Sequence, residues 1–191
     1  NWQNPYVLYR TSTSTRLYGG KIIYGNVFDT NFSISYRAGI TDVSNDVIGS
    51  INSDLRQDGI THTISLNYRY PLTKVLNLIP AFTYERGDYD GRSNSYNQYE
   101  GSLALNIKTQ IAIITGRIYG NTAEFDSTHP IYNRTRDGRT YGAGILATFP
   151  NPFGLKRYAI SAGINTSKTN SNINFFESDA TMGFLSIGYR F

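Results

Sequence analysis

A chain of 191 residues is long enough for one domain, and its charged fraction of 17%, with a net charge of +4 and no dense Lys/Arg run, argues against nucleic-acid binding. It has no cysteine, which excludes disulfides, thiolate metal sites and cysteine nucleophiles. Its longest apolar runs, such as IAII at 111–114, are far shorter than the roughly 18–20 residues of a membrane-spanning helix, which excludes a helical membrane protein.

Apolar and polar residues alternate along most of the chain, and this period of two predicts β-strands with two different faces. From Phe32 to Ile40 the apolar row reads Phe, Ile, Tyr, Ala, Ile, and the row between them reads Ser, Ser, Arg, Gly. Most predicted strands have 8–13 residues, close to the about 9–11 that cross a bilayer when tilted. In chain order, the predicted strands are 5–12, 16–26, 31–42, 61–71, 76–86, 96–108, 110–121, 139–149, 156–168 and 180–191.

Short and long connections alternate between these strands. The first connection, 13–15, is the exception, because it is short where a long one is expected. The short ones that follow are 27–30, 72–75, Thr109 and 150–155, and the long polar ones are 43–60, 87–95, 122–138 and 169–179. Short turns at one end and long loops at the other are typical of an outer-membrane barrel.

We therefore predict one domain over 1–191, an all-β antiparallel transmembrane β-barrel of about ten strands, or more if further strands precede Asn1. The apolar row would face lipid and the polar row the lumen. A soluble β-sandwich is the alternative, since it would show the same alternation with its apolar row inward. Tyrosines near the strand ends would form an interfacial aromatic girdle: Tyr96, Tyr99, Tyr141 and Tyr158.

Several segments resemble an uncharacterised family of Gram-negative outer-membrane β-barrel proteins, known as a domain of unknown function. The matching segments are NPY (4–6), YPLTKVLNLIPAFTYERGDYDGRSNSYN (70–97), HPIYNRTRDGRTYG (129–142), NPFG (151–154) and NSNINFF (170–176). The last three more loosely resemble the barrel end of surface lipoprotein assembly modifiers, which move lipoproteins to the cell surface.

The resemblance implies a location rather than an activity. It implies a multi-pass barrel in the outer membrane of a Gram-negative bacterium, with the long loops outside. Outer-membrane lipid and lipopolysaccharide are then the expected partners, and a protein partner is not identified. Barrels of this kind often end on an aromatic residue that the barrel-assembly machinery reads, and the terminal Phe191 fits that signal.

Charged residues on the row opposite the lipid row are candidates to line a channel. They are mostly basic, so an open lumen would favour small anionic solutes, as in a porin. A non-conducting surface scaffold or interaction barrel stays open as an alternative, because eight strands already fill with side chains and Arg–Glu pairs could plug ten. A protein-translocation accessory barrel is a further one. The lumen candidates are Lys21, Arg37, Arg69, Glu85, Glu100, Lys108, Arg117, Arg157 and Arg190.

A basic segment in the predicted loop 122–138 offers candidates for a surface ligand. Arg134, Arg136 and Arg139 could bind lipopolysaccharide phosphate or another anion, because the guanidinium fork suits phosphate. The alternative is a turn at Asp137–Gly138 with solvated charges around it.

No enzyme, metal or cofactor site is expected. The acidic stretch 87–95 lacks the ligand spacing of a calcium loop. The chain has only two histidines: His62 at a strand start, and His129 in a predicted loop before Pro130. Neither sits in a recognisable nucleophile–base arrangement, so no catalytic residue is assigned.

Overall fold

The computed structural model describes residues 14–25, 31–44, 52–155 and 157–189, and within them nine long antiparallel strands form one sheet in chain order. A two-residue strand, β4 (Tyr70–Pro71), pairs with β5 beside the end of β3. The nine strands are β1 (Ser14–Gly25), β2 (Phe32–Ser44), β3 (Gly59–Tyr68), β5 (Leu76–Tyr89), β6 (Tyr96–Lys108), β7 (Ile113–His129), β8 (Arg134–Pro150), β9 (Tyr158–Ser171) and β10 (Ser178–Tyr189).

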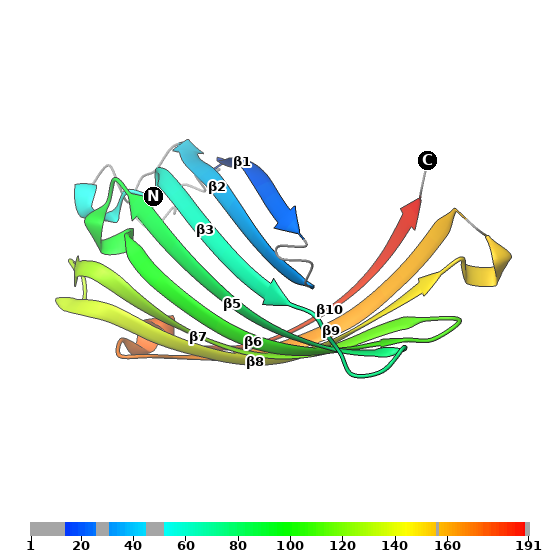
Figure 1. The fold of residues 1–191 in the computed structure, drawn as a ribbon. Helices are drawn as coiled ribbons and strands as arrows, with labels where there is room; N and C mark the ends of the chain where they lie inside the picture. The colour runs from blue at the N-terminus through cyan, green and yellow to red at the C-terminus, as the bar shows by residue number, and fades with distance from the viewer. Residues whose placement is uncertain (1–13, 26–30, 45–51, 156, 190–191) are drawn as a thin grey trace, which may run out of the picture.

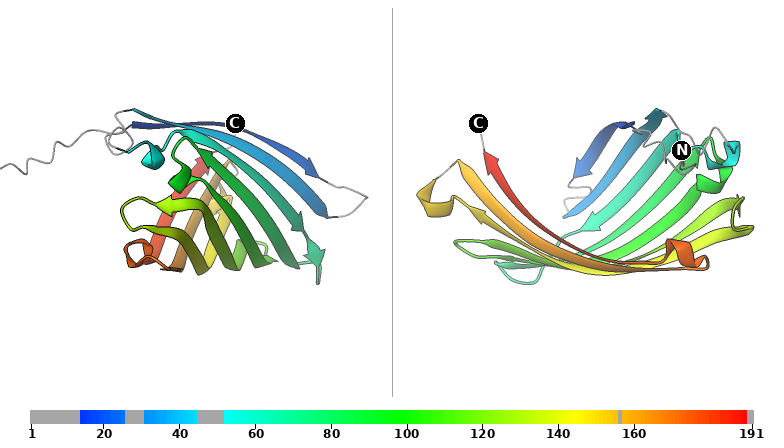
Figure 2. Two further views of the ribbon diagram at one scale, coloured as in Figure 1. Left: turned by 90° about the vertical axis from the view of Figure 1, so that its left-hand side faces the viewer. Right: turned by 180° about the vertical axis from the view of Figure 1, so that it is seen from behind.

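The sheet curves into a trough with β1 and β10 at its two rims (Figure 1; Figure 2). Nine antiparallel strands in sequence order mean that β1 and β10 run in the same direction. These two strands are not paired with each other among the described residues. The predicted all-β antiparallel sheet is thus confirmed, whereas closure into a barrel stays a prediction. The single curved layer also shows that the two-sheet sandwich alternative is wrong.

The strand boundaries differ most from prediction at the hairpin of β7 and β8. Both strands have 17 residues and meet at a turn over 130–133, so the predicted long loop 122–138 is wrong. The ladder continues beyond the apolar part of each strand and carries a bulge between Glu124 and Thr128. The polar side chains of this stretch resemble those of a loop, but its backbone stays paired. The predicted strand 5–12 lies outside the described residues.

Compact loops cover one end of the trough, called here the loop end. Three of its 3₁₀ turns are η2 (Ser53–Leu55), η3 (Arg92–Asn94) and η5 (Asn174–Phe176). The Asn94 side-chain amide donates to the carbonyl oxygens of Leu55 and Arg56 at 2.9 Å each, tying the first two loops together. The other end, the turn end, carries η4 (Pro152–Gly154). No helix in the described part of the chain is long and apolar enough to span a membrane.

The residues that line one cavity show which row of side chains lies on the concave face of the sheet. Thr41 and Val43 on β2 and Arg136 on β8 line the same cavity of about 260 Å³, together with Tyr89 and Tyr96. Strands β2 and β8 are five places apart in the sheet, or about 24 Å if it were flat. Their side chains can share a cavity only across the inside of the curve, so the row that carries them faces inward.

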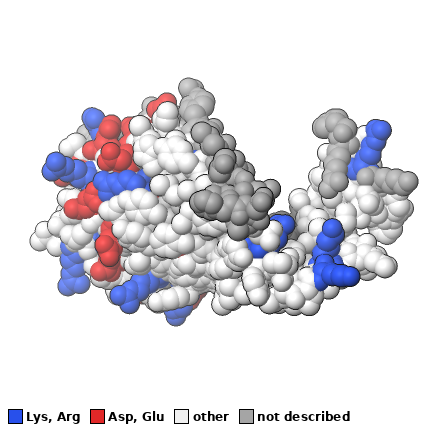
Figure 3. Space-filling model, in the orientation of Figure 1, with Lys and Arg blue, Asp and Glu red and all other residues white. Residues whose placement is uncertain are grey.

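The opposite, convex face is apolar and uncovered. Ile118 and Ile145 at its centre are 61% and 58% exposed, although such side chains are normally buried. Among the described residues only Val43, Leu55, Ala112 and Ile173 are buried hydrophobics, so the sheet has no ordinary apolar core. Figure 3 shows charge of both signs at the loop end, a broad uncharged band across the strands, and only Lys and Arg toward the turn end.

Candidate functional site

The concave face carries a polar network centred on Glu85. Its carboxylate accepts hydrogen bonds from the Tyr96 hydroxyl at 2.6 Å and the Thr63 hydroxyl at 2.9 Å. The Arg37 guanidinium lies 3.5 Å from the same carboxylate. Because Arg37, Thr63 and Glu85 face one another in register across β2, β3 and β5, alternation alone brings them to one face. Within this network the charge of Arg37 is balanced by a carboxylate.

A second balanced pair lies further across the concave face. Arg117 on β7 forms an ion pair with Glu100 on β6. The Arg117 guanidinium also lies 5.0 Å from the ring centre of Tyr119, whose hydroxyl accepts a 3.2 Å hydrogen bond from the Asn165 amide on β9. Among the described side chains, the middle of the concave face is therefore hydrophilic but nearly neutral.

Arg136 is held differently, between aromatic rings at the loop end. Its guanidinium carbon lies 3.5 Å from the ring centre of Phe125 and 4.2 Å from that of Phe176. Both distances are within the range of cation–π attraction. Tyr96 packs beside Phe125 at 5.4 Å, so the same rings join Arg136 to the Glu85 network. We call Arg136, Phe125, Phe176 and Tyr96 the mouth cluster.

His129 supports this cluster from the end of β7. Its buried ring packs on Tyr132 at 4.9 Å and on Phe176 at 5.6 Å. The ring nitrogen Nδ1 accepts a 3.3 Å hydrogen bond from the Ile131 amide. Burial first, and the positive charge of Arg136 second, lower the pKa of His129 below its usual value. The histidine is thus a packing residue, favoured in its neutral form.

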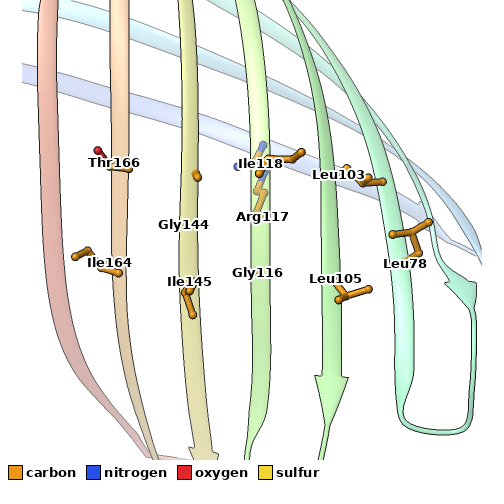
Figure 4. Close-up of a pocket in the computed structure, with 11 residues that line it drawn as sticks. Leu78, Leu103, Leu105, Gly116, Arg117, Ile118, Gly144, Ile145, Ile164 and Thr166 are labelled. Atoms are coloured by element: carbon orange, nitrogen blue, oxygen red, sulfur yellow. The ribbon is translucent and has the colours of Figure 1, made fainter.

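The convex face has a shallow apolar hollow of about 610 Å³ between β5 and β9. Figure 4 shows its Leu and Ile side chains around Gly116, which carries no side chain on this face. An alanine Cβ built at Gly116 would have nothing within 4 Å. The hollow is a gap in the apolar belt, and the polar residues among its described lining are Thr166 and Arg117, the latter already paired with Glu100.

The predicted lumen residues are distributed unevenly. Arg37, Glu85, Glu100 and Arg117 lie on the concave face and are brought together as two pairs. Three others lie at the turn end and form no ion pair within the described part of the chain: Arg69, Lys108 and Arg157. Of these, Arg157 donates a 3.3 Å hydrogen bond to the Tyr189 hydroxyl. Lys21 is opposite Arg37 in the β1–β2 register, but its side chain lies outside the described set, as does Arg190.

Two expectations about loop and interface residues are corrected. Arg134, Arg136 and Arg139 lie within β8, and Asp137–Gly138 is paired strand rather than a turn. Among the predicted girdle tyrosines, Tyr99, Tyr141 and Tyr158 are exposed, whereas Tyr96 lies on the concave face against Glu85.

Sequence reasoning missed Phe125 and Phe176 as partners of Arg136. They lie 11 and 40 positions from Arg136 in sequence, on separate elements. Alternation along a strand predicts which face a residue occupies, but not which side chains from other elements contact it. No group of three or more His, Asp or Glu side chains in the described ranges could hold a metal ion.

Comparison with known proteins adds one finding. A family model described as "Protein of unknown function (DUF2860)" matches residues 1–190 of the chain. No curated protein matches it. All nine strands and the mouth cluster lie within the matched residues.

Proposed function

The chain belongs to the family described as "Protein of unknown function (DUF2860)", and we propose that its sheet is the wall of an outer-membrane β-barrel in a Gram-negative bacterium. Its polar concave face would line a passive path for small, preferentially anionic solutes. The long loops would lie outside, near lipopolysaccharide. The C-terminal strand would be the segment that the barrel-assembly machinery reads.

The observation that carries this proposal is the uncovered apolar belt on the convex face. Exposed Leu and Ile side chains occupy successive positions of neighbouring strands, as Leu103 and Leu105 do beside Ile118. In water such a patch would drive aggregation, whereas in a bilayer it faces hydrocarbon. Strands of 10–17 residues are long enough to cross that layer at a tilt.

The preference for anions rests on which charges lack a counter-charge. Arg37 and Arg117 are neutralised by Glu85 and Glu100, so they contribute little net field. Among the described residues, Arg69, Lys108 and Arg157 at the turn end and Arg136 at the loop end are positive groups that form no ion pair. A path with such ends would concentrate anions.

Cysteine accessibility tests the orientation of the wall. The chain has no native cysteine, so Ser102→Cys and Leu103→Cys introduce single thiols on opposite faces of β6. In liposomes, a membrane-impermeant maleimide should label the thiol at position 102 and spare the one at 103. Equal labelling of both, with the strand structure intact by circular dichroism, would contradict a lipid-facing convex side.

Conductance tests the path itself. Full-length protein in a planar bilayer under a salt gradient should give steady single-channel steps with a reversal potential biased toward anions. Replacing Arg69 and Arg157 with Glu should shift that bias toward cations. A reversal potential that neither substitution shifts would contradict the assignment of these residues to the path.

A second candidate function is a non-conducting surface scaffold. The loops joined through Asn94 and the mouth cluster occupy the loop end of the trough, and both ion pairs cross its concave face. A correctly inserted protein that gives no channel steps would favour this scaffold and direct attention to the loops.

A further inference from the structure

We propose that the mouth cluster is a binding site for a small soluble anion, a carboxylate or phosphate group held by the in-plane edge of the Arg136 guanidinium. The site would lie in the 260 Å³ cavity between β2 and β8. It does not require the barrel to conduct, because binding can be measured on protein in micelles.

The first argument is that the N–H donors of the Arg136 guanidinium find no hydrogen-bond acceptor among the described residues. Its side chain is half-buried, yet within the described residues the guanidinium forms no ion pair and donates no hydrogen bond. Arg37 and Arg117, two other arginines of the concave face, each have a carboxylate. Burial also lowers the pKa of Arg136, as expected for a cation with no anion beside it.

The second argument is orientation. The guanidinium carbon of Arg136 lies over the rings of Phe125 and Phe176, and neither ring offers an oxygen or nitrogen acceptor to the N–H groups. A guanidinium edge is a rigid fork that matches a carboxylate or phosphate with two parallel hydrogen bonds. Because the aromatic contacts limit its rotation, part of the entropic cost of binding is removed in advance.

The third argument is the lining of the cavity. Besides Arg136, its lining among the described residues is Thr41, Val43, Gln57, Tyr89, Asn94 and Tyr96, a set that contains no carboxylate. Glu85, which the Tyr96 hydroxyl contacts, is already engaged by Arg37 and Thr63. Hydroxyl and amide groups beside aromatic rings suit a small solute that has an anionic head and a planar body.

A neighbouring cavity shows why the anion is assigned to the concave side. Arg136 also borders a space of about 430 Å³, but there Glu124 and Asp137 offset the charges of Arg136 and Arg139, so that space has no net positive charge to hold an anion. The concave cavity is also on the side of the sheet away from the apolar belt. A free solute can therefore reach it, whereas a lipid-bound phosphate beside the convex face cannot do so directly.

Calorimetric titration of full-length protein in micelles with benzoate and with benzamide tests the proposal. Benzamide has nearly the same shape without the charge. Wild type should bind benzoate at least about tenfold more tightly than benzamide, the size of a charge-assisted hydrogen bond, and inorganic phosphate should compete. Arg136→Gln should abolish the preference, and Arg136→Lys should lose about tenfold because the fork is lost.

Two further variants make the result specific. Arg139→Gln removes a charge three residues away on the convex face and should leave benzoate affinity unchanged. Thr41→Leu fills the cavity from β2 without touching the aromatic contacts of Arg136, and should weaken benzoate binding even if Arg136 variants fold poorly. Equal affinity for benzoate and benzamide, unchanged binding by Arg136→Gln or Thr41→Leu, or binding of lipopolysaccharide alone would each overturn the proposal.

Discussion

The Arg86 guanidinium on β5 and the Asp126 carboxylate on β7 form a two-pronged ion pair, with N–O distances of 2.8 and 2.6 Å, across the start of β6. Forty positions separate the two residues in sequence. Each also has its pKa moved in the direction that favours its charge, chiefly by that hydrogen bond: upward for Arg86, downward for Asp126. The pair lies at the loop end, beyond the apolar belt.

This pair should stabilise the loop end modestly and lose its effect in acid. Both side chains are about one-third exposed, so a double-mutant cycle of Arg86→Gln and Asp126→Asn should give a coupling of about 0.5–1 kcal/mol in the free energy of unfolding. The folded-state pKa of Asp126 is depressed, so this stability is complete above its ordinary value of 3.8 and is lost as pH falls through the lower folded value. Urea unfolding at pH 7 and pH 3 measures both. A coupling that is unchanged at pH 3 would contradict the assignment.

Removing the Glu85 carboxylate should be costly on the concave face. Glu85→Ala leaves the hydroxyls of Thr63 and Tyr96 and the Arg37 guanidinium without their acceptor, at about 1–3 kcal/mol. Glu85→Gln keeps an acceptor oxygen and should recover most of that loss. Urea midpoints compare the variants, with the exposed Glu177→Ala as a control expected to be neutral. A Glu85→Ala variant as stable as the control would show that the network contributes nothing.

Two glycines on adjacent strands should respond in opposite ways to alanine. A Cβ at Gly142 would collide with the Tyr119 side chain, so Gly142→Ala should cost about 1–3 kcal/mol and disturb the hydrogen bond from Asn165. Gly116→Ala meets nothing within 4 Å and should be neutral or stabilising by about 0.4–1 kcal/mol.

Thermal or urea unfolding separates these outcomes, and Tyr119→Ser provides the internal check. In that background the penalty of Gly142→Ala should disappear, because the colliding ring is gone. A penalty that persists without the ring would place its cause elsewhere.

Much of the sheet was predictable, because successive side chains of a β-strand point to opposite faces. The prediction for 96–108 matches β6 at both ends, and the same rule assigned Arg37, Glu85, Glu100 and Arg117 to one face. The same alternation also limits which tyrosines can share a face. Tyr96 and Tyr99 are three residues apart in one strand and therefore must face opposite sides, so they could not both belong to an outer girdle.

The mouth cluster was beyond prediction from one sequence. Its members come from β6, β7, β8 and η5, and only the curvature of the sheet brings β8 opposite β2. The hairpin of β7 and β8 was missed for a related reason. Its outer row becomes polar at Glu124 and Asp137, which resembles a loop, while backbone pairing continues regardless of side-chain polarity.

His129 should titrate below its ordinary pKa of 6.5. Because the folded-state pKa is depressed, the stability linked to it is complete above pH 6.5 and is lost as pH falls through the folded value, where the buried ring gains a proton. Nitrogen-15 NMR of labelled histidine measures the pKa, and Arg136→Gln should raise it by removing a nearby positive charge. A pKa at or above 6.5 in the wild type would show that the ring is not buried as described.

The last prediction uses the Arg117–Glu100 pair to test the path. Glu100→Gln removes the counter-charge of Arg117 on the concave face, so it should shift the reversal potential of a conducting protein further toward anions. Glu124→Gln removes the same charge from the convex face at the loop end and should shift it less, because that side chain lies outside the path. Conductance of the wild type comes first, since a silent bilayer would count against the channel itself. Equal shifts from the two variants would show that net surface charge, and not the concave row, sets selectivity.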